Sequence, residues 1–295
     1  MVVEVELWFY FAITKFKKIT NKIFSKHATS LSYIRVLLLF YIPFSNTYTM
    51  VELTFNQGIL FKNLIDSMKG LVEDACLLFN ENGITMQAMD SSHVSMCFME
   101  INPSAFSTFN LSQPEILGIN LVSLSKVLKC MGTSDTISLK SNDDVSILSL
   151  MFANTNKKMS FDLKLMDIDN EFLGIPEQEY SCIISVTCVE FSKIVRDLET
   201  MGDDCRIRCT ENIVTFSVKG DLGDVEIEVE GIISMYKNPV EDSFSLRYLK
   251  LFTQASPLCT TTTLSLSLNM PMCVEYAFDG GRLGFFLAPR IVDEE

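Results

Sequence analysis

The stretch that decides the fold runs through EFSKIVRDLETM at 190–201 and ends in VEIEVE at 225–230. The apolar side chains of the first segment recur every three or four positions: Phe191, Ile194, Val195 and Leu198. This spacing predicts an amphipathic helix. In the second segment apolar residues alternate with glutamates, which predicts a strand with one buried and one exposed face. Two further strand-like segments, 206–209 and 213–218, lie between them. The stretch therefore predicts one helix followed by antiparallel strands.

The same unit of a helix and then strands occurs four times along the chain. Apolar stripes place the helices at about 58–76, 121–130, 190–201 and 246–254. The expected strands are 84–88, 93–101, 136–140, 146–152, 206–209, 213–218, 224–230, 263–269 and 273–278. A recurring supersecondary unit indicates internal duplication. The units are paired two and two, so we expect an α+β protein with large antiparallel sheets and two similar domains.

A connector separates the two pairs of units. Residues 167–180, DIDNEFLGIPEQEY, contain Gly174, Pro176 and five acidic residues, and they fit neither helical nor strand periodicity. This composition is typical of an extended, exposed linker. We therefore expect a first domain at 50–166, an interdomain connecting loop at 167–180 and a second domain at 181–295.

Residues 1–49 differ in kind from the remainder. They carry six basic and two acidic residues, and their longest apolar run, 36–42, is far shorter than the roughly 20 residues of a membrane-spanning helix. A basic stretch before a short apolar core also occurs in signal and transit peptides. However, the nine cysteines are scattered without a Cys-x-x-Cys pair, which favours buried thiols in a reducing compartment. We interpret 1–49 as an extension outside the folded unit, with Met50 as a natural start.

The charge of the chain is negative, but its basic residues are not randomly placed. The net charge is −13, which argues against a protein that coats nucleic acid with its whole surface. Eight basic residues lie in pairs on the polar faces of the four expected helices: Lys62 and Lys69, Lys126 and Lys129, Lys193 and Arg196, Arg247 and Lys250. One such pair is usually only solvated. Four equivalent pairs related by pseudosymmetry would form one positive surface.

Residues for catalysis or metal binding are scarce. The chain has two histidines, His27 and His93, and Asp90 is too near His93 in sequence to suggest a triad assembled from separate elements. The acidic residues of the connector resemble a calcium loop, but Phe172 stands where glycine is needed. There is no P-loop, no Gly-x-Gly-x-x-Gly and no His/Cys metal spacing. We expect no enzyme, no cofactor and no metal; a hydrolase with His93 as base is the alternative from another class.

Seven short motifs carry a family resemblance. They are MDSSHV at 89–94, LSKVLKC at 124–130, LKLMDID at 163–169, LGIPEQEYSC at 173–182, LRYL at 246–249, VEY at 274–276 and LAP at 287–289. In their order and spacing, residues 50–295 resemble the proliferating cell nuclear antigen (PCNA) family, the DNA sliding clamps of eukaryotic replication. Residues 1–49 have no counterpart in that family.

The resemblance implies a DNA-clamp fold and a ring. Each chain would have two similar domains with helices inside and sheets outside, and three chains would close head to tail around duplex DNA. The segments 159–164 and 224–229 are the edge strands expected to pair between neighbours. The implied function is that of a homotrimeric DNA polymerase processivity factor in the nucleus, active in DNA replication and repair. The alternative is one subunit of a checkpoint-type heterotrimeric clamp; the intact connector and the LAP motif argue against it.

The resemblance also implies two sets of site residues. Those facing double-stranded DNA, without sequence preference, are Lys62, Lys69, Lys126, Lys129, Lys193, Arg196, Arg247 and Lys250. Those framing a pocket for client peptides are Met89, His93, Val94, Met96, Leu173, Ile175, Pro176, Tyr180, Pro271, Phe286, Leu287, Ala288 and Pro289.

The family pattern implies which partners use these sites, and the sequence departs from it at three positions. The implied clients are a replicative polymerase, the clamp loader, flap endonuclease and DNA ligase, with no membrane partner. Asn63 and Gln254 stand where the family usually has lysine, which makes the implied DNA face less basic. Glu211 replaces the lysine that receives ubiquitin or SUMO in many members, so the resemblance does not extend to that regulation.

Overall fold

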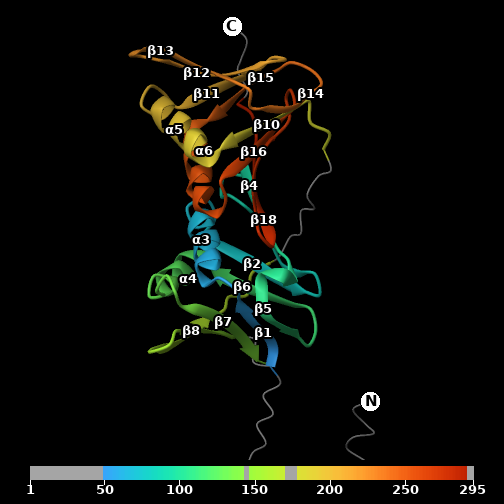
Figure 1. Ribbon diagram of the computed structural model, residues 1–295, viewed down its shortest axis with the longest axis vertical. Helices are drawn as coiled ribbons and strands as arrows, with labels where there is room; N and C mark the ends of the chain where they lie inside the picture. The colour runs from blue at the N-terminus through green and yellow to red at the C-terminus, as the bar shows by residue number, and fades with distance from the viewer. Residues whose placement is uncertain (1–48, 143–145, 170–177, 291–295) are drawn as a thin grey trace, which may run out of the picture. The chain divides into compact units, whose positions relative to one another are not determined.

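The computed structural model describes residues 49–142, 146–169 and 178–290 (Figure 1). All of them belong to one compact unit, which starts at Tyr48. Among these described residues, no helix is long and apolar enough to cross a membrane.

Two of the three antiparallel sheets each belong to one half of this unit. The five-stranded sheet has the order β5 (Phe106–Leu111), β1 (Thr49–Phe55), β7 (Thr136–Asn142), β8 (Ile147–Ala153) and β9 (Lys158–Lys164). The four-stranded sheet has the order β13 (Gly223–Glu230), β12 (Ile213–Gly220), β11 (Asp204–Cys209) and β15 (Val240–Ser245). β9 and β13 are therefore edge strands of their sheets.

The third sheet is shared by both halves of the unit. Its nine strands have the order β14 (Ile233–Tyr236), β10 (Cys182–Thr187), β16 (Thr261–Leu266), β17 (Met272–Phe278), β18 (Gly281–Leu287), β4 (Ser95–Ile101), β3 (Gly83–Met89), β2 (Asp74–Asn80) and β6 (Glu115–Asn120). The junction is the antiparallel pair of β18 and β4, whose register runs from Gly281 opposite Ile101 to Leu287 opposite Ser95. The two halves are therefore joined by a continuous hydrogen-bonded ladder.

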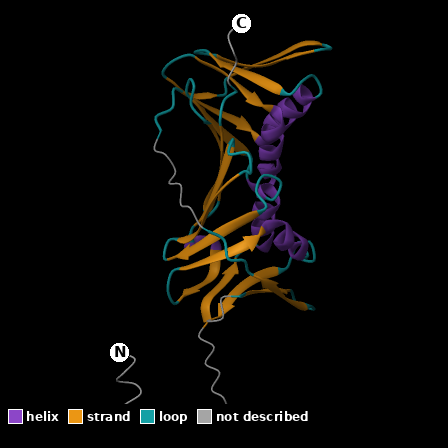
Figure 2. Cartoon of the chain, turned by 180° about the vertical axis from the view of Figure 1, so that it is seen from behind, coloured by secondary structure: helices purple, strands orange, loops and turns teal. Residues whose placement is uncertain are grey.

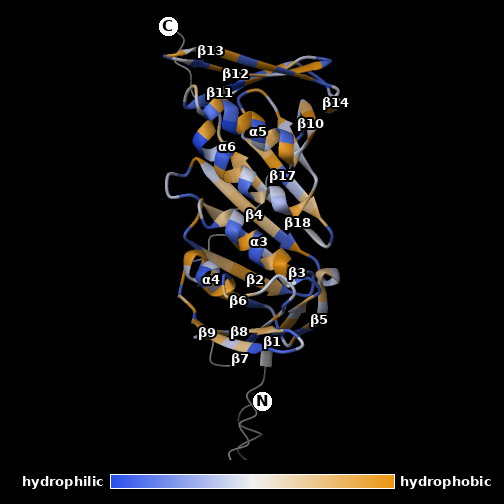
Figure 3. Ribbon diagram, turned by 60° about the vertical axis from the view of Figure 1, so that its left-hand side comes forward, coloured by the Kyte–Doolittle hydropathy of each residue, from blue (hydrophilic) through white to orange (hydrophobic). Residues whose placement is uncertain are grey.

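The four α-helices lie on one side of the sheets (Figure 2). They are α3 (Gly58–Met68), α4 (Leu121–Leu128), α5 (Cys188–Glu199) and α6 (Leu246–Phe252), with short 3-10 helices η1 (Pro103–Ala105) and η2 (Thr253–Leu258). Two α-helices begin with side-chain caps: Asn120 accepts a hydrogen bond from the Ser123 amide, and Thr187 from the Glu190 amide. Each helix buries its apolar face against the sheets, and Figure 3 shows hydrophilic and hydrophobic residues together on each helix.

The expected α+β class and the four helices are confirmed, but the first helix was predicted too long. α3 ends at Met68, not near residue 76. The amides of Leu71 and Val72 both bond back to the Met68 carbonyl, so the chain turns after Gly70, a poor helix former. Val72 is buried, which explains why it continued the apolar stripe beyond the end of the helix.

Several strands were not predicted from the sequence. They are β1, β2, β5, β6, β10, β14, β15 and β18. β2 shows the reason: Ala75, Cys76 and Leu77 are buried in succession, so both faces of the strand are covered and the alternating pattern is lost. β4 begins at Ser95, not at His93, because His93 has a φ of 56° and lies in the preceding turn.

Gly83 provides a test of the tight β2–β3 hairpin. Its φ is +117°, and an added Cβ would lie 1.9 Å from the Ile101 carbonyl oxygen. We expect Gly83→Ala to lower the free energy of unfolding by about 3 kcal/mol, because it combines an unfavourable φ with a backbone clash. Gly223→Ala is the control: its φ is +138°, but no atom lies within 4 Å of the added Cβ. It should cost only about 1 kcal/mol in urea unfolding, and equal losses for the two variants would contradict this account.

Candidate functional site

The eight predicted basic residues all lie on the helices or at their C-caps. Lys62 and Lys69 on α3 are half-buried. The other six are exposed: Lys126, Lys129, Lys193, Arg196, Arg247 and Lys250. The four helices with their C-caps carry eight basic and four acidic residues, a net charge of +4, whereas residues 50–295 carry 18 basic and 35 acidic residues, a net charge of −17. Positive charge is therefore concentrated on the helix side of a strongly acidic unit.

Ion pairs compensate three of the eight charges. Lys69 pairs with Asp66, Lys250 with Glu199 at 2.8 Å, and Arg196 with its neighbour Asp197 at 3.7 Å. Within the described part of the chain, five make no ion pair: Lys62, Lys126, Lys129, Lys193 and Arg247. These five are the cations available to an anionic partner without breaking an existing ion pair.

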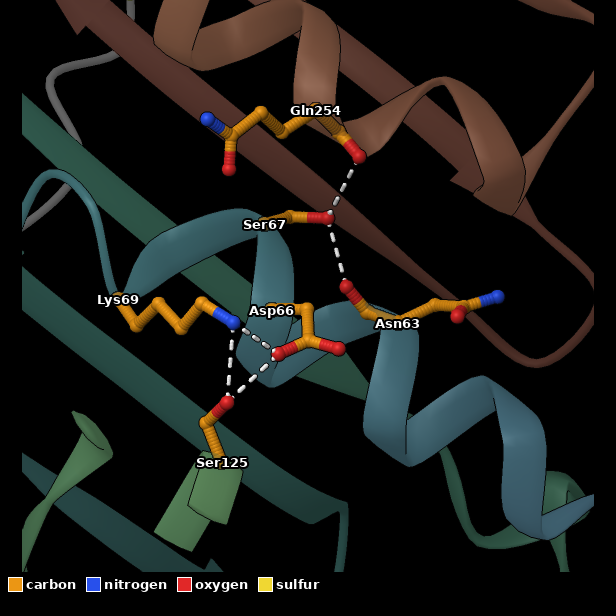
Figure 4. A network of polar contacts seen from close by, with 6 residues as sticks. All are labelled: Asn63, Asp66, Ser67, Lys69, Ser125 and Gln254. Carbon is orange, nitrogen blue, oxygen red and sulfur yellow. Dashed lines mark hydrogen bonds and ion pairs between the residues drawn. The ribbon is translucent and has the colours of Figure 1, made fainter. Parts of the chain in front are cut away.

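The Lys69 pair is part of a polar network between helices α3 and α4 (Figure 4). Lys69 Nζ also donates to Ser125 Oγ at 3.0 Å, and Ser125 Oγ donates to Asp66 Oδ1 at 2.7 Å. Burial by itself would raise the pKa of Asp66, but the hydrogen bonds from Lys69 and Ser125 outweigh it and hold that pKa below its ordinary value. Asp66 is therefore ionised at neutral pH and holds Lys69 against the helix pair.

A second part of the network joins α3 to η2, across the two halves of the unit. Ser67 Oγ lies 2.6 Å from the Asn63 carbonyl oxygen and 3.2 Å from the Gln254 carbonyl oxygen (Figure 4). Both partners contribute backbone oxygens, and Asn63 and Gln254 are the two positions at which the resemblance described above implies lysine. Their uncharged side chains keep this junction free of additional positive charge.

An apolar cluster lies on the face of the nine-stranded sheet opposite the helices. Along β4, Cys97 and Met99 enter the main core, whereas Met96 and Phe98 point the other way, as alternation along a strand requires. This outer apolar cluster consists of Met96, Phe98, Cys273 and Phe286, with Met89 and Tyr180 packed against it. The Phe98 and Phe286 rings are 5.5 Å apart, and the Arg282 guanidinium lies 5.3 Å from the Phe98 ring centroid.

The outer apolar cluster brings together four of the residues predicted for the client pocket: Met89, Met96, Tyr180 and Phe286. Sequence reasoning missed Phe98 and Cys273, although alternation from Met96 along β4 would have pointed to Phe98. Leu287 behaves differently, because its side chain is fully buried in the main core.

The remaining predicted pocket residues are divided between the neighbourhood of the cluster and the undescribed part of the chain. His93 and Val94 are exposed in the turn between β3 and β4, and the Val94 carbonyl oxygen accepts a hydrogen bond from the Ala288 amide at 3.0 Å. Pro271 and Pro289 are half-buried. Leu173, Ile175 and Pro176 lie outside the described residues.

The carboxylate nearest to His93 in the sequence, that of Asp90, is occupied by other donors. The carboxylate of Asp90 accepts hydrogen bonds from the backbone amides of Ser92, Val94 and Ser95 and from the Tyr248 hydroxyl. It is therefore engaged with the turn and not with the His93 imidazole. In the described ranges, no group of three or more His, Cys, Asp or Glu side chains could hold a metal ion.

The nine cysteines are free thiols, and seven of them are buried. Burial raises the pKa of Cys97 and of Cys205 to about 12. These two thiols are protonated at neutral pH and are poor nucleophiles.

Two edge strands, β9 and β13, carry complementary charges. β9 contains Lys158, Lys164 and a single acid, whereas every second residue of β13 from Asp224 to Glu230 is acidic. On both strands the intervening apolar residues are half-buried against the core. Two other edges are partly covered, since the Met166 amide bonds to Gly118 on β6 and the Arg290 amide to Ser243 on β15. β9 and β13 lie at opposite ends of the described unit (Figure 3).

Comparison with known proteins matches this arrangement to one family. The model of the proliferating cell nuclear antigen N-terminal domain matches residues 50–172, and that of the C-terminal domain matches residues 174–291. The chain belongs to the PCNA family. It is similar to the crystal structure of the proliferating cellular nuclear antigen from Entamoeba histolytica, with a TM-score of 0.79 and 32% identity, covering 82% of this chain and 100% of that one. The expected family and its two-domain clamp fold are thereby confirmed.

Proposed function

We propose that this PCNA-family chain is a homotrimeric DNA sliding clamp and polymerase processivity factor, working in the nucleus. The observation that carries the proposal is the layer of uncompensated cations on the helix side of an otherwise acidic unit. Such a surface attracts phosphates without reading bases, while the acidic remainder repels other DNA. The proposed role is that of a non-enzymatic scaffold.

Ring closure would use the two complementary edge strands. Pairing of β9 of one chain with β13 of the next satisfies backbone groups that an isolated edge leaves unpaired. Because the two edges are different surfaces, their contact is head to tail, and such contacts generate rings when the rotation closes. The proposal that the ring contains three chains is taken from the resemblance to the PCNA family. A checkpoint-type heterotrimeric clamp is the second candidate, since its subunit would use the same edges with a different neighbour.

Charge reversal on β9 tests the ring. Lys158→Glu with Lys164→Glu places like charges opposite the acidic β13, so we expect the trimer to dissociate. Light scattering of the parent chain should give three times its mass of 33.3 kDa, and the variant should give the mass of one chain. The matched control is Lys126→Glu with Lys129→Glu, the same charge change on the exposed face of α4 and at its C-cap, which belong to no edge strand. A parent chain that is monomeric at micromolar concentration would favour the heterotrimeric clamp.

The uncompensated helix cations would contact DNA phosphates. Each phosphate contact contributes about 0.9 to the slope of log affinity against log salt on duplex DNA. Retention on DNA would be topological, so the contacts need not be strong. The proposed DNA-facing set is led by the five cations that make no ion pair within the described residues: Lys62, Lys126, Lys129, Lys193 and Arg247. Lys69, Arg196 and Lys250 would contribute less because Asp66, Asp197 and Glu199 already partner them.

Removal of two cations tests the DNA face. Lys126→Ala with Lys129→Ala should weaken binding to a short duplex and reduce the salt slope by about 0.9 for each phosphate that is no longer neutralised, as measured by fluorescence anisotropy. The control is Arg206→Ala with Arg208→Ala, which removes the same charge from the opposite face of the four-stranded sheet. On β11 the intervening Cys205, Ile207 and Cys209 are the residues that point to the core. Equal slopes for both variants would show that the helices do not share a DNA-facing surface.

Client peptides would bind at the outer apolar cluster. A peptide with an aliphatic and aromatic plug on a short helical turn could add its apolar side chains to this surface. The exposed Val94 at the edge of the cluster and the ring pair of Phe98 and Phe286 supply apolar contact area. The proposed clients are the replicative polymerase, the clamp loader, flap endonuclease and DNA ligase. Glu211, exposed in the turn between β11 and β12, offers no lysine for ubiquitin or SUMO.

A single charge at the edge of the cluster tests this site. The test ligand is a synthetic peptide that presents one leucine and two phenylalanines on a helical turn. Val94→Glu should lower the affinity for this peptide by at least about tenfold, because a charge would be buried against apolar groups. The control is Ile116→Glu, at an apolar residue that is 48% exposed, compared with 36% for Val94. Calorimetry would measure both affinities. Similar losses for the two variants would place the peptide elsewhere.

A further inference from the structure

The turn between β3 and β4 adopts a conformation that must be held in place. His93 has a φ of 56°, and it is one of two non-glycine residues in the described ranges with a positive φ. A residue other than glycine stays in this region only when its surroundings impose it. The turn carries the exposed Val94 at the edge of the outer apolar cluster, so whatever fixes the turn also fixes part of the proposed peptide site.

One buried carboxylate organises almost the whole turn. Asp90 is 5% exposed, and its Oδ1 accepts hydrogen bonds from the Val94 amide at 2.8 Å and the Ser95 amide at 2.7 Å. Its Oδ2 accepts from the Ser92 amide at 3.1 Å. The His93 amide bonds to the Asp90 carbonyl oxygen at 3.0 Å. Burial by itself would raise the pKa of the Asp90 carboxyl group. The hydrogen bonds that it accepts from the three backbone amides and from Tyr248 outweigh burial and lower that pKa below its ordinary value, so the side chain is a charged acceptor.

The fourth donor to this carboxylate comes from the helix side. The Tyr248 hydroxyl, on α6, donates to Asp90 Oδ2 at 2.7 Å, and Tyr248 is 8% exposed. Burial raises the pKa of Tyr248, so the phenol keeps the proton that it donates. The preceding residue, Arg247, places its guanidinium 5.7 Å from the centre of the Tyr248 ring. A side chain from the cationic helix layer therefore supports a turn at the edge of the sheet's opposite face.

The other side of the turn is tied to the end of β18. Ser95 Oγ donates to the Phe286 carbonyl oxygen at 2.7 Å, and the Ala288 amide bonds to the Val94 carbonyl oxygen at 3.0 Å. Phe286 belongs to the outer apolar cluster. The turn is thus held between α6 and β18, and its position sets the distance between Val94 and the cluster.

We infer that Asp90 and Tyr248 are positioning residues of the peptide site, which hold Val94 and the end of β18 in their binding arrangement without touching the peptide. The inference rests on the proposed function, because it assumes that client peptides bind at the outer apolar cluster. A surface already held in its binding arrangement loses less conformational freedom on association, which increases affinity. The side of the chain assigned to DNA thereby supplies a residue on which peptide binding depends.

Tyr248→Phe is the decisive variant, because it removes one hydroxyl and keeps the ring beside Arg247. We expect the leucine and phenylalanine peptide to bind the full-length trimer about three- to tenfold more weakly, since part of a charge-assisted hydrogen bond is lost from the bound arrangement. Hydrogen exchange should become faster at the amides of Ser92, Val94 and Ser95 and remain unchanged elsewhere. The trimer mass and the salt slope of DNA binding should equal those of the parent.

Ile207→Val is the control for general destabilisation. Ile207 is fully buried in β11, remote in the sheet order from the turn, so this variant should lower thermal stability without changing peptide affinity. Asp90→Asn is a second variant, which replaces a charged acceptor oxygen by an amide donor. It should lower the affinity for the peptide more than Tyr248→Phe does.

The outcomes separate this inference from the function on which it rests. If the parent trimer does not bind the peptide, the proposed peptide site is wrong. If the parent binds and Tyr248→Phe binds equally well, the positioning role is overturned. If Ile207→Val weakens the peptide as much as Tyr248→Phe, or if exchange rises throughout the chain, the effect is one of stability and the inference is likewise overturned.

Discussion

The pairing of β18 with β4 is the constraint on which the rest of this structure depends. It joins strands that are about 180 residues apart into one ladder, so that both halves of the unit share a nine-stranded sheet. Once this sheet exists, alternation along its strands defines two faces. Residues such as Cys97 and Val274 enter the main core on one face, and Phe98 and Cys273 enter the outer apolar cluster on the other. The helices and the outer apolar cluster therefore lie on opposite faces of one sheet.

Charge follows the same division. The helix layer holds a surplus of cations, while the strand β13 and much of the remaining surface are acidic. The surplus is moderated locally, because Asp66 and Glu199 neutralise Lys69 and Lys250. The pair of Lys69 and Asp66 is half-buried, and the other pair joins an exposed lysine to a half-buried glutamate. Their main consequence is electrostatic, since they lower the positive potential near the junction of α3 and η2 without removing it from α4 and α5.

Sequence periodicity was sufficient for the helices and insufficient for many strands. Phe191, Ile194 and Leu198 mark α5 unambiguously, because one face of a helix against a sheet repeats every three or four residues. β2 gave no such signal, since both of its faces are covered. The position of the outer apolar cluster was out of reach of periodicity, because Met96 and Phe286 become neighbours only through the long-range pairing of their strands. The motifs that resemble the PCNA family supplied what local patterns could not.

The contact between Asp90 and Tyr248 was also invisible in the sequence. Asp90 and Tyr248 are separated by 158 positions, and a lone aspartate before two serines reads as an ordinary turn residue. Only the fold shows that the carboxylate is buried and that its last donor comes from α6. The basic helix faces could be inferred from spacing, but which lysines remain unpaired could not, because ion pairs such as Lys250 with Glu199 join different helices.

The continuous sheet has a mechanical consequence. Because the two halves of the chain share an uninterrupted hydrogen-bonded ladder of strands, there is no hinge between them. Bending at the junction would break several backbone hydrogen bonds at once. In the proposed ring, the contacts between chains would be single strand pairs at the ends, with β9 only seven residues long. Any gap that admits DNA into the proposed ring would therefore open at an interface between chains, by separation of two nearly rigid bodies. Each chain would act as an inflexible segment of the ring.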